Sequence, residues 1–254
     1  VRSSVTFHAA SLERAGLSGR GGAGFPTARK FAAITGPKPV VIGNGAEGEP
    51  LSRKDAVLLT RAPHLVLDGL DAAADAVKAD KVYLYLHAKA MPAAAKALDE
   101  RRAAGLDRHA VSLIEAPDTF VAGEESAAIR HVEGGPALPR DRTVIAAVSG
   151  VRGRPTLVNN VETLAHIGLL ARYGPDWFRS VGDEADPGSM LVTLSGALAD
   201  TGVTEVATGA SLTGLIAQSG GTDLRAILVG GYHGTWIPAG ALEGLTLSRT
   251  SLKS

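Results

Sequence analysis

Residues 39–50, with the sequence PVVIGNGAEGEP, join an apolar run to a polar loop that contains several glycines. The run at 39–43 predicts a buried strand that leads into the loop at Asn44-Gly45. Outward from this segment, apolar runs alternate with helical patterns, which is typical of α/β proteins. Strands are expected at 81–86 and 110–114, and helices from Ala56, Leu65 and Pro92. The sequence therefore predicts an α/β, Rossmann-like domain with a largely parallel sheet.

The pattern changes after about residue 186. The expected elements there are strands at 190–196, 202–206 and 226–231 and a helix at 212–219. Short strands around a single helix predict a small β-grasp, ubiquitin-like module, for which residues 183–188 would be the hinge. We therefore expect two domains, 1–186 and 187–254.

Composition excludes several classes of function. Lys and Arg number 26, as do Asp and Glu, so the basic surplus of a general nucleic-acid binder is missing. There is no cysteine, and none of the seven histidines forms an i, i+4 pair, so no metal site is expected. The sequence shows neither a secretory signal nor an apolar run of about 20 residues. A cytoplasmic protein without a membrane span is the expectation.

A glycine-rich loop, GRGGAGFPT at residues 19–27, precedes the first strand and is followed by Lys30. Glycines allow the backbone to approach a ligand closely, and proline suits the start of a helix. Free N–H groups at such a helix start bind anions, and Lys30 could neutralise a phosphate. The loop lacks the Gly-Lys-Ser/Thr that a P-loop has after a longer spacer. It also fails the dinucleotide fingerprint, which should follow a strand, because residues 10–17 before it resemble a helix or turn. It predicts a phosphate-binding loop of another kind, or a glycine turn without a ligand.

Three more polar clusters have both a functional and a structural interpretation. The loop 44–50 places ligand-binding groups after a parallel strand, or is a solvated acidic turn. The segment FVAGEES, 120–126, offers a glycine and two acids to a ligand, or its glutamates simply favour the first turn of a helix. The segment PTLVNNVETL, 155–164, offers neutral donors, or Asn159 or Asn160 caps a helix.

Together, in this order, the four clusters resemble the motifs of the FMN-carrying, NADH-oxidising flavoprotein subunit of respiratory complex I. Its relatives in NAD-linked hydrogenases and formate dehydrogenases share them, and the NGAEGEP form is also similar to the flavin-bearing subunit of Rnf-type reductases. The resemblance covers about residues 12–178 and continues more weakly through the β-grasp, SLBB-like region. It implies an FMN-binding first domain.

The resemblance also implies roles for individual residues. FMN would be held by Gly19, Arg20, Gly21, Gly22, Ala23, Lys30, Asn44, Glu47, Phe120, Gly123, Glu124, Asn159, Asn160 and Thr163. NAD(H) would contact Phe25, Glu49, Glu125 and Arg142, with Glu125 as the catalytic residue. In this family hydride passes between nicotinamide C4 and flavin N5, and electrons leave singly to an iron–sulfur subunit or a ferredoxin within a multi-subunit complex.

Several positions depart from the family. Ala33 and Ile145 stand where the family has two of the phenylalanines that clamp the adenine, and each lost stacking pair costs about 0.5–1.5 kcal/mol. Ala46 replaces an aspartate, and Arg142 replaces a lysine. The cysteines of the family's [4Fe–4S] domain are missing, so a truncated sequence or a member without the cluster is expected.

Two other hypotheses remain open because of these departures. The chain could be a flavin electron-transfer subunit that no longer binds nicotinamide and links a ferredoxin-like protein to another redox partner. It could also be a scaffold that has lost FMN, for which Ala46 is the only direct support.

Overall fold

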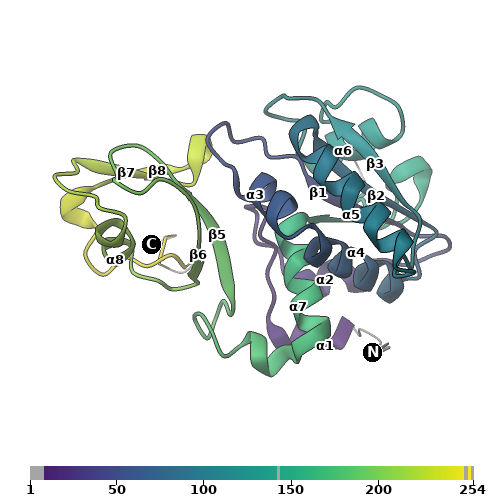
Figure 1. Ribbon diagram of the computed structural model, residues 1–254, viewed down its shortest axis with the longest axis horizontal. Helices are drawn as coiled ribbons and strands as arrows, with labels where there is room; N and C mark the ends of the chain where they lie inside the picture. The colour runs from purple at the N-terminus through teal and green to yellow at the C-terminus, as the bar shows by residue number, and fades with distance from the viewer. Residues whose placement is uncertain (1–8, 142–143, 249–250, 253–254) are drawn as a thin grey trace.

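The computed structural model describes residues 9–141, 144–248 and 251–252. Two lobes are visible in Figure 1, a larger one built on a parallel sheet and a smaller one built on antiparallel strand pairs. Within these described ranges, none of the helices combines the length and the apolar character needed to span a membrane.

The larger lobe contains four parallel strands in the order β3-β2-β1-β4. They are β1 (Val40–Gly45), β2 (Lys81–His87), β3 (Val111–Ala116) and β4 (Thr156–Asn160). The prediction of an α/β fold with a parallel sheet is confirmed. The sequence pattern misses β4, because its five residues end in two asparagines and therefore resemble a helix start more than a strand.

Helices cover both faces of this sheet. They are α1 (Ala9–Ala15), α2 (Thr27–Ala32), α3 (Lys54–Arg61), α4 (Pro63–Val77), α5 (Met91–Ala103), α6 (Glu125–Val132) and α7 (Val161–Phe178). One core unites α4 and α7 with buried leucines of β2 and β4, including Leu84 and Leu157. The opposite face packs Ile129 of α6 against Ile42 and Tyr85. The sheet is thus a buried middle layer, as a parallel sheet requires.

Two glycines allow α4 and α7 to pack closely. A Cβ on Gly69 would lie 1.7 Å from the carbonyl oxygen of Leu164, and one on Gly168 would lie 2.9 Å from that of Leu65. Real side chains do not approach backbone this closely, so an added methyl group would force the helices apart.

The smaller lobe pairs β5 (Ser189–Leu194) with β6 (Gly202–Ala207) and β7 (Ala226–Val229) with β8 (Thr235–Pro238), both antiparallel. Helix α8 (Leu212–Gln218) contributes Leu212 to a small core with Leu242 and Leu247. The predicted strands and helix are found here. The β-grasp assignment and the domain boundary at 186/187 remain predictions.

The close packing of α4 and α7 gives a stability test. We expect Gly69→Ala to lower the free energy of unfolding by about 1–3 kcal/mol, because the methyl group overpacks the helix contact. Gly214→Ala in α8 is the matched control, since its Cβ would meet only Ser211 at an ordinary 3.5 Å. Urea unfolding of both variants measures the effect. A Gly69→Ala protein as stable as the control would contradict the packing argument.

Candidate functional site

The four polar clusters converge on the carboxyl edge of the parallel sheet. In the register of β1 and β4, Asn44 pairs with Asn160 and Gly43 with Asn159. The glycine loop reaches the same edge, because the Arg20 N–H donates to Thr163 Oγ1 at 2.9 Å. The loop after β3 also joins it, since Asn44 Nδ2 donates to the Gly123 carbonyl at 2.8 Å. Ligand sites of α/β proteins lie at this edge.

The glycine loop is a closed turn with an exposed tip. Gly19 N donates to the Phe25 carbonyl at 2.9 Å, which closes residues 19–25, and α2 begins directly after Pro26. Gly22 has a φ of +103°, and a Cβ there would meet nothing within 4 Å. Helix α1 precedes the loop, so the dinucleotide fingerprint is absent, as the sequence predicts. The tip therefore offers open space beside exposed backbone.

Lys30 places a positive charge at the sheet edge. Its Nζ donates to the Val158 carbonyl at 3.0 Å and to Glu125 Oε1 at 3.1 Å. The Lys30 side chain is 33% exposed and that of Glu125 is 43% exposed, so the pair is accessible to a ligand. A screened pair of this kind contributes little to stability, so either partner can exchange it for a ligand at small cost.

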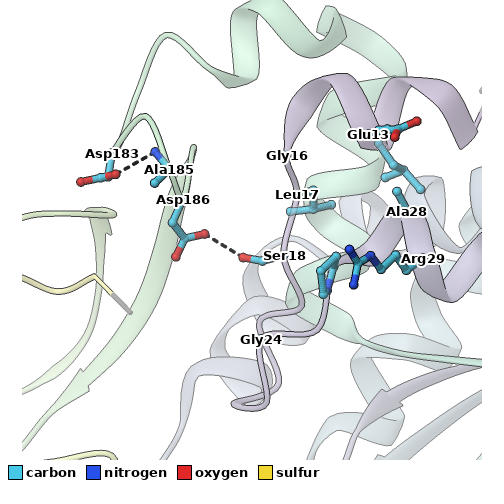
Figure 2. Close-up of a pocket in the computed structure, with 12 residues that line it drawn as sticks. Glu13, Gly16, Leu17, Ser18, Gly24, Ala28, Arg29, Asp183, Ala185 and Asp186 are labelled. Carbon is cyan, nitrogen blue, oxygen red and sulfur yellow. Dashed lines mark hydrogen bonds between the residues drawn. The ribbon is translucent and has the colours of Figure 1, made fainter. Parts of the chain in front are cut away.

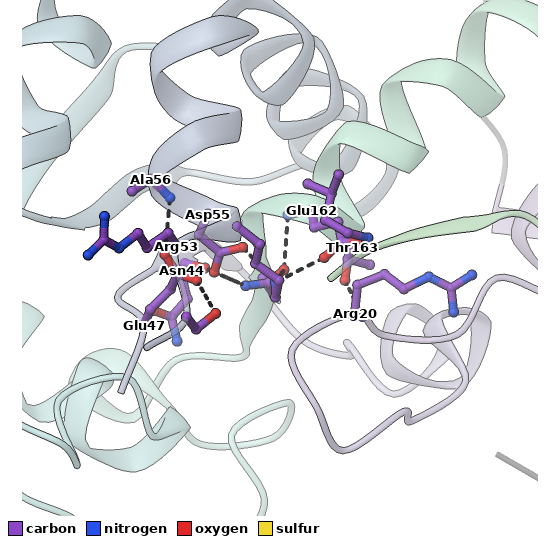
Figure 3. A network of polar contacts seen from close by, with 12 residues as sticks. Arg20, Asn44, Glu47, Arg53, Asp55, Ala56, Glu162 and Thr163 are labelled. Carbon is purple, nitrogen blue, oxygen red and sulfur yellow. Dashed lines mark hydrogen bonds and ion pairs between the residues drawn. The ribbon is translucent and has the colours of Figure 1, made fainter. Parts of the chain in front are cut away.

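A buried polar network underlies the edge (Figure 3). Lys54 Nζ contacts Asp55 Oδ1 at 2.6 Å and Glu162 Oε2 at 2.9 Å, and donates to Asn160 Oδ1 at 3.3 Å. Asn160 Nδ2 donates to Asp55 Oδ2 at 2.5 Å. Burial raises the pKa of Asp55 to about 6, against the opposing effect of Lys54. Burial alone would lower the pKa of Lys54, but the two carboxylates raise it above its ordinary value. Lys54, Asp55 and Glu162 are not among the residues that the sequence motifs lead us to expect in the site.

Three residues expected to bind the cofactor have a visible structural role as helix caps. Glu47 accepts from Ala56 N at 3.1 Å at the start of α3. Glu124 accepts from Ser126 N at 2.8 Å and Ala127 N at 3.0 Å at the start of α6. Asn160 Oδ1 accepts from Glu162 N at 2.9 Å and caps α7. The capping interpretation thus holds for Asn160 rather than Asn159.

Asn159 is different, because it is only 4% exposed and its Nδ2 has no hydrogen-bond partner among the described residues. A buried donor without a partner costs roughly 1–3 kcal/mol. Its neighbour along β4, Val158, carries the carbonyl that Lys30 contacts. Asn159 therefore supplies an unused donor, and the residue before it in β4 has the carbonyl that binds the Lys30 cation.

Arg20 is directed away from the loop tip. Its guanidinium donates to Asp186 Oδ1 at 3.1 Å, to the Pro187 carbonyl at 2.9 Å and to the Ser189 carbonyl at 3.1 Å. The side chain therefore ties the glycine loop to the segment that enters the smaller lobe, while the Arg20 backbone N–H is bonded to Thr163. A buried arginine with several acceptors is a long-range contact that no local motif indicates.

The loops after β1 and β3 pack closely against each other at two glycines. A Cβ on Gly123 would lie 2.1 Å from the Ala46 carbonyl oxygen, and one on Gly48 would lie 2.2 Å from that of Phe120. Both glycines are therefore required by packing. The Phe120 side chain is 44% exposed.

The residues expected to contact the nucleotide differ in their exposure and in their partners. Phe25 is 47% exposed on the glycine loop, and Glu125 stands beside Lys30. Glu49 is directed to the smaller lobe, where its carboxylate accepts from Tyr232 N at 3.0 Å. Arg142 lies outside the described residues.

A hollow of about 360 Å³ lies behind the glycine loop (Figure 2). It is bounded by α1, the start of the loop, α2 and residues 183–186, and Ser18 Oγ donates to Asp186 Oδ1 at 2.7 Å in its wall. Of the expected site residues, none lines it. The hollow lies between the lobes and is separate from the edge at Asn44 and Asn160.

Comparison with known proteins identifies the family. Residues 12–169 match the Nuo51 FMN-binding domain. The chain belongs to the Nuo51 FMN-binding domain family. The resemblance inferred from the four motifs is thereby confirmed. The chain is 32% identical over 252 residues to an NADH-quinone oxidoreductase subunit of Rhizobium meliloti, covering 91% of this chain and 60% of that protein.

Other members are hydrogenase subunits. The chain is 35% identical to NAD-reducing hydrogenase HoxS subunit alpha of Cupriavidus necator, covering 86% of this chain and 39% of that subunit. The crystal structure of an NAD⁺-reducing [NiFe]-hydrogenase in the air-oxidised state matches with a TM-score of 0.90 at 36% identity, over 96% of this chain and 44% of that one. The chain spans about half the length of the curated relatives it matches.

The buried carboxyl of Asp55 gives a pH test. Its pKa of about 6 is above the ordinary 3.8, so its contribution to stability is complete below pH 4 and is lost as the pH rises through 6. We expect the stability of the wild type relative to Asp55→Asn to fall by roughly 2–3 kcal/mol between pH 4 and pH 7. Urea unfolding of both proteins across this pH range measures the difference in the free energy of unfolding.

Asp99→Asn is the control, because Asp99 is exposed and, among the residues that the structure describes, pairs only with Arg102 on the same helix. A difference between wild type and Asp55→Asn that stays constant from pH 4 to pH 7 would contradict the assignment.

Proposed function

We propose that the chain binds FMN at the carboxyl edge of the sheet. With this cofactor the chain oxidises NAD(P)H, or reduces NAD(P)⁺, as an electron-transfer subunit of a larger complex. The observation that carries the proposal is the arrangement of the glycine loop, the Lys30 cation and the unused donor of Asn159 around the end of β4. Membership of the FMN-binding family supports the choice of cofactor.

The residues present fit FMN. Lys30 and the open tip at Gly22 suit a phosphate, since a cation and exposed backbone N–H groups both favour an anion. Asn159 would donate to a phosphate or ribityl oxygen and so satisfy its buried amide. Asn44 and Gly123, joined by a hydrogen bond, would border the ring. Glu47, Glu124 and Asn160 would act by holding α3, α6 and α7 in place.

FMN, when bound, supplies the change between two-electron hydride transfer and one-electron transfer. The protein's own residues then orient the nucleotide. Glu125 would meet its polar groups at the mouth beside Lys30, and the exposed Phe25 ring would stack on a base. Names of relatives include both NAD-reducing and NADP-reducing hydrogenases, so we assign NAD(P) without a choice between the two.

Electrons would leave to an iron–sulfur subunit or a ferredoxin. These 254 residues contain no cysteine, so they do not hold a thiolate-ligated cluster themselves. Relatives named as subunits of NADH-quinone oxidoreductases and of hydrogenases support a partner within a multi-subunit complex.

Removing the Lys30 charge tests the FMN site. We expect Lys30→Met to raise the Kd for FMN about tenfold or more, because a charged hydrogen bond to the phosphate is worth about 1.5–3 kcal/mol. Quenching of flavin fluorescence on titration into the apoprotein measures the Kd. Lys96→Met is the control, since Lys96 is 78% exposed on α5. Equal affinities for the two variants would contradict the assignment of Lys30.

Anaerobic addition of NADH to the FMN-loaded chain separates the main proposal from a second one. Bleaching of the visible flavin band supports NAD(P)H oxidation. A flavin that bleaches only with dithionite supports an electron-transfer subunit without nicotinamide, which Ala33 and Ile145 in place of two aromatic residues favour. A chain that cannot be loaded with FMN would overturn both.

A further inference from the structure

The end of β2 brings a histidine beside the loop that follows β1. His87 is the last residue of β2, and its neighbour Leu86 pairs with Gly45, the last residue of β1. His87 therefore lies one residue beyond the paired part of the two strands, where the loop 46–50 begins. Its Nε2 is 3.1 Å from the Glu47 carbonyl oxygen. Because a carbonyl oxygen only accepts, Nε2 carries the hydrogen and donates it.

The other ring nitrogen of His87 is left without a bond. Nδ1 is buried and has no hydrogen-bond partner among the described residues. A buried polar atom without a partner costs free energy, so an apolar side chain would serve better if the position only needed to be filled. The bond from Nε2 to Glu47 is therefore the physical reason for a histidine at this position.

The peptide that His87 contacts lies beside the segment proposed to border the flavin ring. A Cβ on Gly123 would lie 2.1 Å from the Ala46 carbonyl oxygen and 3.7 Å from Gly48 N, so the two loops leave no room for a side chain here. His87 contacts the backbone of Glu47 and not its carboxylate, which caps α3. The histidine thus acts directly on the course of the loop.

The direction of the Glu47 carbonyl also sets the direction of the next N–H. The C=O and N–H groups of one trans peptide point to opposite sides of the chain. With the Glu47 carbonyl turned to His87, the Gly48 N–H is turned away from it. Within the ranges that the structure describes, Gly48 N donates to no other group. Gly48 therefore presents an unused backbone donor beside Gly123, at the proposed FMN edge.

We propose that His87 is a positioning residue of the FMN site. Through the Glu47 carbonyl it fixes the peptide between residues 47 and 48, and so it holds the Gly48 N–H available to FMN. This inference rests on the proposed function. A donor that is held in place before the ligand arrives loses little freedom on binding, which favours affinity. The role requires one N–H at the position of Nε2 and nothing at Nδ1.

Two amide variants test this role, because each places an N–H donor at a different position. The amide nitrogen of glutamine reaches the position of histidine Nε2, whereas that of the shorter asparagine reaches only the position of Nδ1. We expect His87→Gln to bind FMN as tightly as the wild type. His87→Asn and His87→Leu should bind it about threefold to tenfold more weakly, the loss of one hydrogen bond. Quenching of flavin fluorescence on titration into the apoprotein measures each Kd.

His64→Leu is the control, since the His64 side chain is 49% exposed and contacts Glu100 of α5. Its Kd should equal that of the wild type. Equal Kd values for the wild type, His87→Asn and His87→Leu would overturn the proposal. A His87→Gln protein that binds FMN as weakly as His87→Leu would overturn it too, because the donor at the Nε2 position would then be irrelevant.

Hydrogen exchange of the flavin-free chain measures the contact independently of FMN. We expect the amides of residues 46–50 to exchange about threefold faster or more in His87→Asn and His87→Leu than in the wild type and His87→Gln. Equal exchange in all four proteins would overturn the proposal. A wild type that takes up no FMN is a different result, which contradicts the proposed function, and exchange then decides alone whether His87 fixes this peptide.

Discussion

Burial of the Lys54 ammonium beside two carboxylates is the constraint on which the site depends. Removing a charge from water costs several kcal/mol, and the cost is offset only when well-placed partners surround it. Here Asp55 and Glu162, both with side chains 3% exposed, and Asn160 provide them. These partners belong to α3, α7 and β4, so the network holds three elements in one arrangement.

That arrangement sets the roles of the neighbouring asparagines. Both polar atoms of the Asn160 amide have partners. Nδ2 donates to Asp55, and Oδ1 accepts from the start of α7 and from Lys54. Successive residues of a strand point to opposite faces, so Asn159 projects away from the network and keeps its amide donor unused. A rigid structural residue next to an unused donor is what a preorganised binding site needs, because the donor loses little freedom when a ligand arrives.

The same elements also connect the lobes. The second carboxylate oxygen of Glu162 accepts from Leu191 N of β5 at 2.7 Å, and Arg20 binds Asp186. A third link is made by the Glu49 carboxylate, which accepts from Tyr232 N in the turn between β7 and β8. Each of these links starts from a segment at the proposed FMN edge, so the position of the smaller lobe depends on the loops that would bind the cofactor.

Local pattern was sufficient for much of the fold and for the four polar clusters that make up the candidate site. Strands β1 to β3 and the intervening helices follow from apolar periodicity, and the glycine loop and the two asparagines were found from their composition. The missed features depend on contacts distant in sequence. Strand β4 is defined by its pairing with β1, the direction of the Arg20 side chain by residue 186, and the burial of Lys54 by residue 162. A short stretch of sequence around any of these residues does not contain that information.

A crystal structure of the chain loaded with FMN tests the central claim most directly. The account predicts the phosphate at the glycine loop beside Lys30, and an FMN oxygen within hydrogen-bond distance of Asn159 Nδ2. FMN bound elsewhere, for example in the hollow behind the loop, with Asn159 still without a partner, would contradict it.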